Sequence, residues 1–123
     1  MIGYVTLGSN DRVKAAKYYD DLLSVVGAKR AMEDGDRFIG WSNGQGAMLA
    51  VARPFDGNPA TVGNGNMVAL AMKSRAAVDE IHAKAMSLGS KDEGAPGLRG
   101  GNFYGAYFRD LDGNKLCCFY MGA

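Results

Sequence analysis

The residues of this chain with the most evident chemistry are two adjacent cysteines, Cys117 and Cys118, in the closing stretch KLCCFYM. This stretch has the composition of a β-strand, in which neighbouring side chains point to opposite faces. The two thiols should therefore not bond to each other. A reactive thiol at Cys117 would need a base or a positive field nearby, which Arg99 or Arg109 would supply. The alternative is that both cysteines are small buried hydrophobes.

His82 is the single histidine, and a histidine titrates near neutral pH, which suits a general base. It lies on a helix predicted to run from its cap at Ser74 through Leu88, beside an apolar stripe that includes Val78 and Ile81. That helix should pack on the outside of a sheet. We therefore expect a histidine at the surface or at the helix edge and not a catalytic base.

Two further motifs are turns or loops in our interpretation. Asp110-Leu111-Asp112-Gly113-Asn114 resembles the start of a calcium loop but lacks the later glutamate, so we predict a tight turn with a positive φ at Gly113. The glycine-rich stretch 95–105 lacks the strand-to-helix context of a phosphate-binding loop. We predict a long loop there, able to act as a flap.

The elements that would position these residues follow from periodicity and punctuation. A helix follows the first strand, with Ser9 or Asn10 as its N-cap and Gly27 at its end, and Gly89 ends the second helix. Turns are expected at 35–36 and 43–46. The predicted strands are Met1–Gly8, Ala28–Glu33, Arg37–Trp41, Ala47–Arg53, Asn66–Lys73, a weak one at Ser90–Glu93, NFYGAYF and KLCCFYM.

The same order of elements occurs twice. Asp11 and Ser74 begin the two helices, and Gly27 and Gly89 end them, at offsets of about 60 residues typical of a repeated supersecondary unit. We predict an α+β fold with one domain over residues 1–123, made of module 1 (1–53), a linker (54–65) and module 2 (66–123). Two βαβββ modules would form a cupped, incompletely closed eight-stranded mixed sheet with helices on its convex side.

Composition excludes several classes of partner. The chain has 123 residues, 47% of them hydrophobic, with 14 basic and 13 acidic side chains. A near-zero net charge argues against nucleic acid and against an anionic membrane surface as partners. The sequence carries no long apolar segment and no signal-peptide pattern, so we expect a cytoplasmic protein. The cysteines form no disulfide framework and no CxxC zinc motif.

The chain resembles the vicinal oxygen chelate superfamily, also called the glyoxalase, bleomycin-resistance and dioxygenase superfamily. The resemblance rests on IGYVTLGSNDRVKAAKYYDDLL, on NMVALAMKSRAAVDEIHAKAMSLG and on FYGAYFRDLDGNKL. The last of these is the most specific, although Leu111 stands where the family usually has proline. The resemblance implies the two-module fold, and it implies a homodimer, which exposed sheet edges also favour.

Metal-dependent members of this superfamily carry histidine or carboxylate ligands on the first, fourth, fifth and eighth strands, which suit a divalent ion that polarises substrate oxygens. By resemblance the first, third and fourth positions here are Tyr4, Met67 and Cys117, and the second lies within Ala47–Val51. None is a usual ligand, apart from a thiolate at Cys117, and sulfur ligands prefer soft metals. We therefore expect no metal cofactor, with a divalent ion as the minor alternative.

The residues that share the predicted concave face are mostly apolar, with a few hydroxyl groups. Small side chains among them would leave a void suited to a planar organic ligand, although the same side chains could instead fill the space as core. The predicted ligand pocket comprises Tyr4, Thr6, Phe38, Trp41, Met67, Ala69, Ala71, Tyr107, Cys117 and Phe119.

Three functions remain open at this point, because a fold does not fix a function. The leading hypothesis is a small-molecule binding protein that works without the usual metal. The second is a glyoxalase-like lyase or isomerase, or a dioxygenase-like enzyme, with a divalent metal at a non-standard site. The third is a non-catalytic interaction scaffold.

Overall fold

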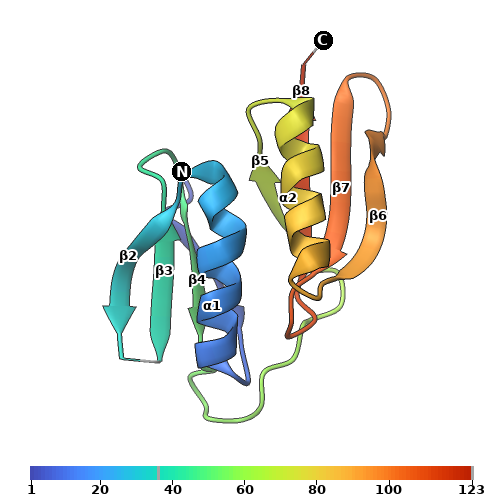
Figure 1. Cartoon of the computed structure of the whole chain (residues 1–123). Coiled ribbons are helices and arrows are strands. Elements are labelled where there is room, and N and C mark those ends of the chain that lie inside the picture. The colour runs from blue at the N-terminus through green and yellow to red at the C-terminus, as the bar shows by residue number, and fades with distance from the viewer. Residues whose placement is uncertain (36, 123) are drawn as a thin grey trace. The chain divides into compact units, whose positions relative to one another are not determined.

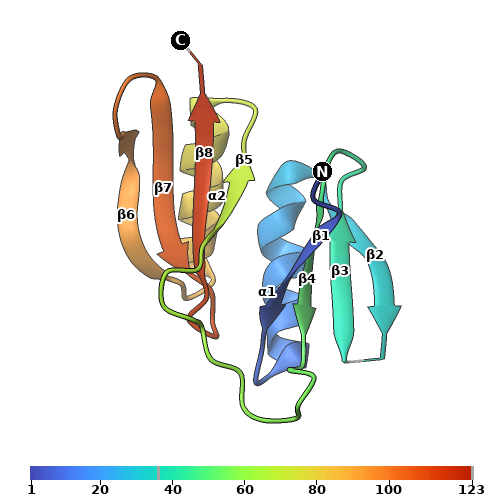
Figure 2. The same ribbon diagram turned by 180° about the vertical axis from the view of Figure 1, so that it is seen from behind.

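The structure is a computed structural model that describes residues 1–35 and 37–122; Asp36, which was expected in a turn, lies outside the described residues. The chain divides into two compact units, Met1–Gly63 and Asn64–Ala123, each shown in Figures 1 and 2. Their boundary falls inside the predicted linker. The α+β class and the two βαβββ modules are confirmed, and each module forms a four-stranded mixed sheet.

Unit 1 contains one helix and four strands, in the sheet order β1-β4-β3-β2, with β1 parallel to β4 and the other pairs antiparallel. A 3₁₀ turn, η1, continues α1 and ends at Gly27, whose φ of 71° suits glycine. The elements of unit 1 are β1 (Tyr4–Gly8), α1 (Arg12–Leu23), η1 (Ser24–Val26), β2 (Lys29–Asp34), β3 (Phe38–Ser42) and β4 (Met48–Ala52).

Unit 2 repeats this plan in the order β5-β8-β7-β6, with β5 parallel to β8. In each unit the helix lies along one face of the sheet (Figure 1), and we call the opposite face the open face. Figure 2 views the strands of each unit from that side. The elements of unit 2 are β5 (Val68–Ala71), α2 (Arg75–Ser87), β6 (Lys91–Leu98), β7 (Phe103–Arg109) and β8 (Lys115–Met121).

Helix starts follow capping chemistry, with one correction. Ser74 caps α2 as predicted, because its Oγ accepts a hydrogen bond of 3.0 Å from the Ala77 amide. The cap of α1 is Asp11, and the prediction of Ser9 or Asn10 was wrong. The Asp11 carboxylate accepts from the Lys14 amide at 3.1 Å, while Ser9 is buried and its Oγ accepts from the Asp11 amide.

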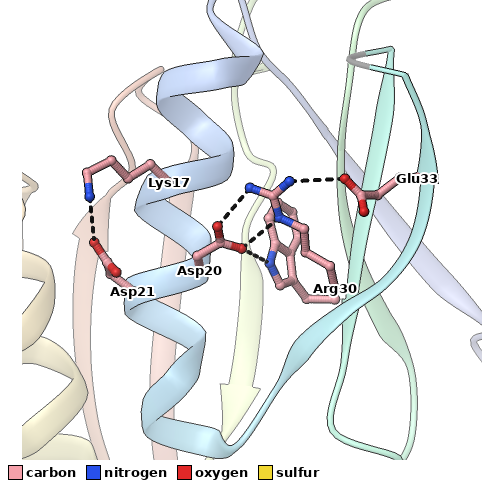
Figure 3. Close-up of polar contacts among 6 residues, drawn as sticks. Lys17, Asp20, Asp21, Arg30 and Glu33 are labelled. Carbon is pink, nitrogen blue, oxygen red and sulfur yellow. Dashed lines mark hydrogen bonds and ion pairs between the residues drawn. The ribbon is translucent and has the colours of Figure 1, made fainter.

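The Asp20 carboxylate links α1 to its sheet through hydrogen bonds (Figure 3). Asp20 on α1 accepts from Trp41 Nε1 at 2.8 Å and from Arg30 Nε and Nη2 at 2.9 and 2.7 Å. Arg30 also donates to Glu33 at 3.0 Å. These donors, Arg30 first, lower the pKa of the Asp20 carboxyl, so it stays ionised at neutral pH. The indole beneath α1 is thereby held in one orientation.

The second module departs from prediction at β6. Residues 95–98 were expected in a long loop, but they belong to this strand, which pairs antiparallel with β7 through Gly97 opposite Gly105 and Leu98 opposite Tyr104. The pairing contains irregularities between Asp92 and Gly97, which accommodate the glycines. The predicted flap is therefore wrong over most of its length.

The turn between β7 and β8 is confirmed. Gly113 has a φ of 92°, and its amide donates to the Asp110 carbonyl at 3.0 Å. The buried Asp110 carboxylate accepts from the Asp112 and Asn114 amides at 2.9 and 2.8 Å and from Asn114 Nδ2 at 3.0 Å. Because its oxygens are used inside the turn, this motif is a structural element and not a calcium loop.

Candidate functional site

The open face of unit 1 is apolar and largely covered by its own side chains. Tyr4 and Phe38 meet edge to face with their ring centroids 6.0 Å apart. The Met48 side chain lies over Gly40, where an added Cβ would come within 2.7 Å of its sulfur. Ala50, opposite both Thr6 and Gly40, is 0% exposed, whereas Tyr4 remains 59% exposed. Unit 1 thus presents an exposed phenol beside a closed apolar surface.

Trp41 does not belong with these residues, although it was predicted to line the pocket. It follows Phe38 by three positions on β3, so the two side chains point to opposite faces. Trp41 is 1% exposed, packs 5.5 Å from the Tyr19 ring of α1 and donates to Asp20. We therefore assign it to the core between the helix and the sheet.

The open face of unit 2 gathers five of the predicted lining residues. Tyr107, Cys117 and Ala69 stand opposite one another across three strands, and Phe119 and Ala71 form the next pair along. Ala69 and Ala71 are exposed, and Tyr107 and Phe119 are half-buried. Small exposed side chains beside half-buried rings are what an accessible ligand surface requires.

The two cysteines separate as predicted. Cys118 is buried on the helix face, where its Sγ lies 4.0 Å from the Val78 carbonyl of α2. Cys117 lies on the open face opposite Tyr107, and it is 1% exposed. Burial raises the pKa of Cys118 to about 12 and also raises the pKa of Cys117. Both thiols therefore stay protonated at neutral pH, which disfavours a nucleophilic or metal-binding thiolate.

The structure places the residues that the resemblance assigns to the superfamily's metal-ligand positions. Tyr4 begins β1 and is largely exposed, Met67 immediately precedes β5, and Cys117 is buried on β8. Both β1 and β5 end three residues before their helix cap, so Tyr4 and Met67, each four residues before the strand end, occupy equivalent positions. A phenol, a thioether and a protonated thiol do not make a donor set for a hard divalent ion. Within residues 1–35 and 37–122, no three His, Cys, Asp or Glu side chains gather as a metal site would require.

A Phe-x-Gly motif that was not predicted as part of the site occurs on the third strand of each module. Phe38 and Gly40 lie on β3, and Phe103 and Gly105 lie on β7. Each glycine lies beneath a side chain, Met48 in unit 1 and the Phe103 ring in unit 2. Phe103 stacks on Phe119 with centroids 5.2 Å apart and planes inclined by 6°. Phe103 therefore joins the candidate lining.

His82 was predicted at the surface or the helix edge, but it is 8% exposed and lies on the sheet side of α2. Its Nε2 is 3.0 Å from Asp92 Oδ1 on β6, and its ring is 6.2 Å from Phe108. A hydrogen bond from the Gly94 amide, then the contact with His82, lowers the pKa of Asp92. The pair links α2 to its sheet, on the side away from the open face.

A separate hollow of about 380 Å³ in unit 1 is lined by the end of α1 and the start of β2. Its charged residues include Asp20 and Arg30, which already bond to each other. It contains none of the predicted site residues, and we do not assign it a function.

Similar solved structures cover almost the whole chain. A glyoxalase/bleomycin resistance protein from Albidiferax ferrireducens T118 is 31% identical, with 99% of each chain covered and a TM-score of 0.89. A glyoxalase/bleomycin resistance protein/dioxygenase family enzyme from Burkholderia phytofirmans PsJN is 18% identical, with 98% of each chain covered and a TM-score of 0.79. A lactoylglutathione lyase from Agrobacterium tumefaciens is 22% identical, with coverage of 98% and 92% and a TM-score of 0.71.

The last two similarities concern the fold alone. No family model and no curated protein matches the chain. No helix in the described part of the chain is long and apolar enough to cross a membrane.

Proposed function

Because the chain belongs to the glyoxalase/bleomycin resistance/dioxygenase superfamily, we propose that it binds a small, largely apolar organic molecule on its open sheet faces without the usual metal centre. One observation carries the proposal: the positions that the resemblance assigns to metal ligands include Tyr4, Met67 and Cys117 here, and the Cys117 thiol is buried with a raised pKa. These side chains offer surface for an organic ligand but no strong ligand for a hard cation.

Exposure and ring geometry support a binding role for these faces. Tyr4 is largely exposed and meets Phe38 edge to face, while Phe103 and Phe119 stack nearly parallel. Aromatic rings on a half-exposed surface favour planar partners, because an added ring stacks on them or meets their edges. Ala69 and Ala71 leave room beside the second pair.

The proposed homodimer and cytoplasmic location stay predictions. All six residues of β2 are exposed at one edge of the first sheet, and an unpaired edge can pair with another chain.

The neutral aromatic amide 2-naphthamide tests the proposed function. We expect it to bind the full chain in ligand-observed NMR and to raise the melting temperature, since a ligand that binds only the folded state stabilises that state. Both effects should be unchanged by EDTA and by added Zn²⁺ or Mn²⁺. Binding that disappears with EDTA and returns with metal would replace the proposal with the metal-enzyme alternative. No binding under any of these conditions would favour the scaffold.

A further inference from the structure

An arginine lies across two glycines on the open face of unit 2. A Cβ added at Gly94 would come within 3.2 Å of Arg99 Nη2, and one added at Gly97 within 3.0 Å of Arg99 Nη1. The guanidinium also donates to the Ala95 carbonyl. The absence of side chains at these two positions of β6 thus lets the Arg99 guanidinium lie close against the strand.

The Tyr107 ring contacts a second cation in addition to this arginine. Arg99 Cζ lies 5.5 Å and Lys115 Nζ 5.6 Å from the centroid of the Tyr107 ring. Both distances are within the range of cation–π attraction, which holds two like charges over one aromatic ring. Arg99 is exposed and Lys115 half-buried, so both remain accessible to a ligand.

Among the described residues these two cations form no salt bridge, although Arg99 contributes to the electrostatic field at Asp92. Glu93 bonds to Arg109 instead, with Oε1 2.7 Å from Nε, although Lys115 contributes to the electrostatic field at Glu93. The neighbouring Cys117 thiol, with its pKa raised by burial, does not neutralise them at pH 7. The result is a local positive charge on a half-buried aromatic surface.

An aromatic surface lies one step farther along the same face. Phe119 follows Cys117 by two positions on β8, about 7 Å along the strand, and stacks with Phe103. Tyr107, which carries the two cations, stands opposite Cys117, so one step of the ladder separates it from Phe119. The exposed Ala69 and Ala71 on β5 pair with Cys117 and Phe119.

We propose that the ligand is a small aromatic acid, whose oxyanion binds Arg99 and Lys115 while its ring lies against Phe103 and Phe119. This inference rests on the proposed function and adds a charge to the ligand. Two cations that form no salt bridge favour a ligand of opposite charge. A guanidinium also donates charge-assisted hydrogen bonds to a carboxylate.

A matched pair of probes tests the inference: 2-naphthoate and 2-naphthamide share a ring system and differ in charge. We expect the full chain to bind naphthoate about tenfold more tightly, the order expected for hydrogen bonds to a charged group. The double variant Arg99→Met/Lys115→Met should lose this preference while its affinity for naphthamide stays within about twofold, because methionine keeps an apolar stem. Lys84→Met, on α2, removes one charge from the same unit and should keep the preference.

The results separate the two proposals. Equal wild-type affinities for the two probes would overturn the aromatic acid and leave the proposed function standing. Absence of binding by both would overturn the proposed function as well. If the double variant does not fold, titration of the wild type at rising salt decides: screening should reduce the naphthoate preference and leave naphthamide binding unchanged. A preference that persists at high salt would contradict the assignment to the exposed cations.

Discussion

The open faces of the two units share a backbone plan but distribute their side chains differently. The two parallel ladders end at equivalent pairs, Gly8 opposite Ala52 and Ala71 opposite Phe119, so Ala52 corresponds to Phe119. In unit 1 the ring of Tyr4 stands on the edge strand and an alanine on the neighbouring strand; in unit 2 alanines stand on the edge strand and Phe119 on the neighbouring strand. The Phe of each Phe-x-Gly motif follows that change and contacts Tyr4 in one unit and Phe119 in the other.

Charge separates the faces further. In unit 1, Tyr4, Phe38 and Met48 share the face of the fully buried Ala50. Among the described residues, no cation lies over the ring of Tyr4 or Phe38. Unit 2 places Arg99 and Lys115 over Tyr107. We infer that one repeated scaffold provides two different surfaces, one apolar and one able to select an anion. Substitutions on the two faces test this difference directly.

The largest effect is expected when a ring is placed within the closed face of unit 1. Ala50→Phe inserts a ring at a fully buried position, and overpacking of this kind costs about 1–3 kcal/mol of the free energy of unfolding. Urea unfolding monitored by circular dichroism would measure it. Ala50→Gly is the control for a change at the same site without added volume. An unchanged midpoint for Ala50→Phe would mean that the first face is not closed.

A smaller effect is expected at the glycines beneath the aromatic and thioether side chains. A methyl group added by Gly105→Ala would come within 2.7 Å of Phe103 Cε1 and displace the ring from Phe119. The loss of the stacked pair should cost about 0.5–1.5 kcal/mol. Gly40→Ala is the matched variant, and its methyl group meets only the flexible end of Met48, so it should cost less. Equal losses in urea unfolding would contradict the proposed difference between the faces.

The smallest effect on stability is expected when unit 2 receives an edge ring like that of unit 1. Ala69→Phe places a ring at an exposed position, so the free energy of unfolding should change by less than about 0.5 kcal/mol. The same ring would occupy the space beside Cys117 and Phe119 and should weaken 2-naphthamide binding. Ala76→Phe, at an exposed position of α2, is the control for a surface aromatic residue. A loss of stability as large as that of Ala50→Phe would identify Ala69 as core.

Several of the incorrect predictions contradict signals that the sequence itself carries. Phe38 and Trp41 are separated by an odd number of positions on one strand, so simple alternation already places them on opposite faces. His82 stands four positions after Val78 and three before Ala85, spacings that belong to the buried side of α2. The Phe-x-Gly repeat was likewise visible in FIG and FYG. These signals are local, and local periodicity is the information that a single sequence carries most clearly.

Within this chain the sequence by itself determined the order of elements, the cap at Ser74, the turn at Gly113 and the opposite orientations of Cys117 and Cys118. Each depends on bonds or alternation within a few residues. Tertiary structure decided the rest. Gly94–Leu98 has poor strand propensity and becomes a strand because β7 supplies the hydrogen bonds. Arg99 and Lys115 both reach the Tyr107 ring only because β6, β7 and β8 lie side by side, and a contact between separate strands is fixed by their register and not by local sequence.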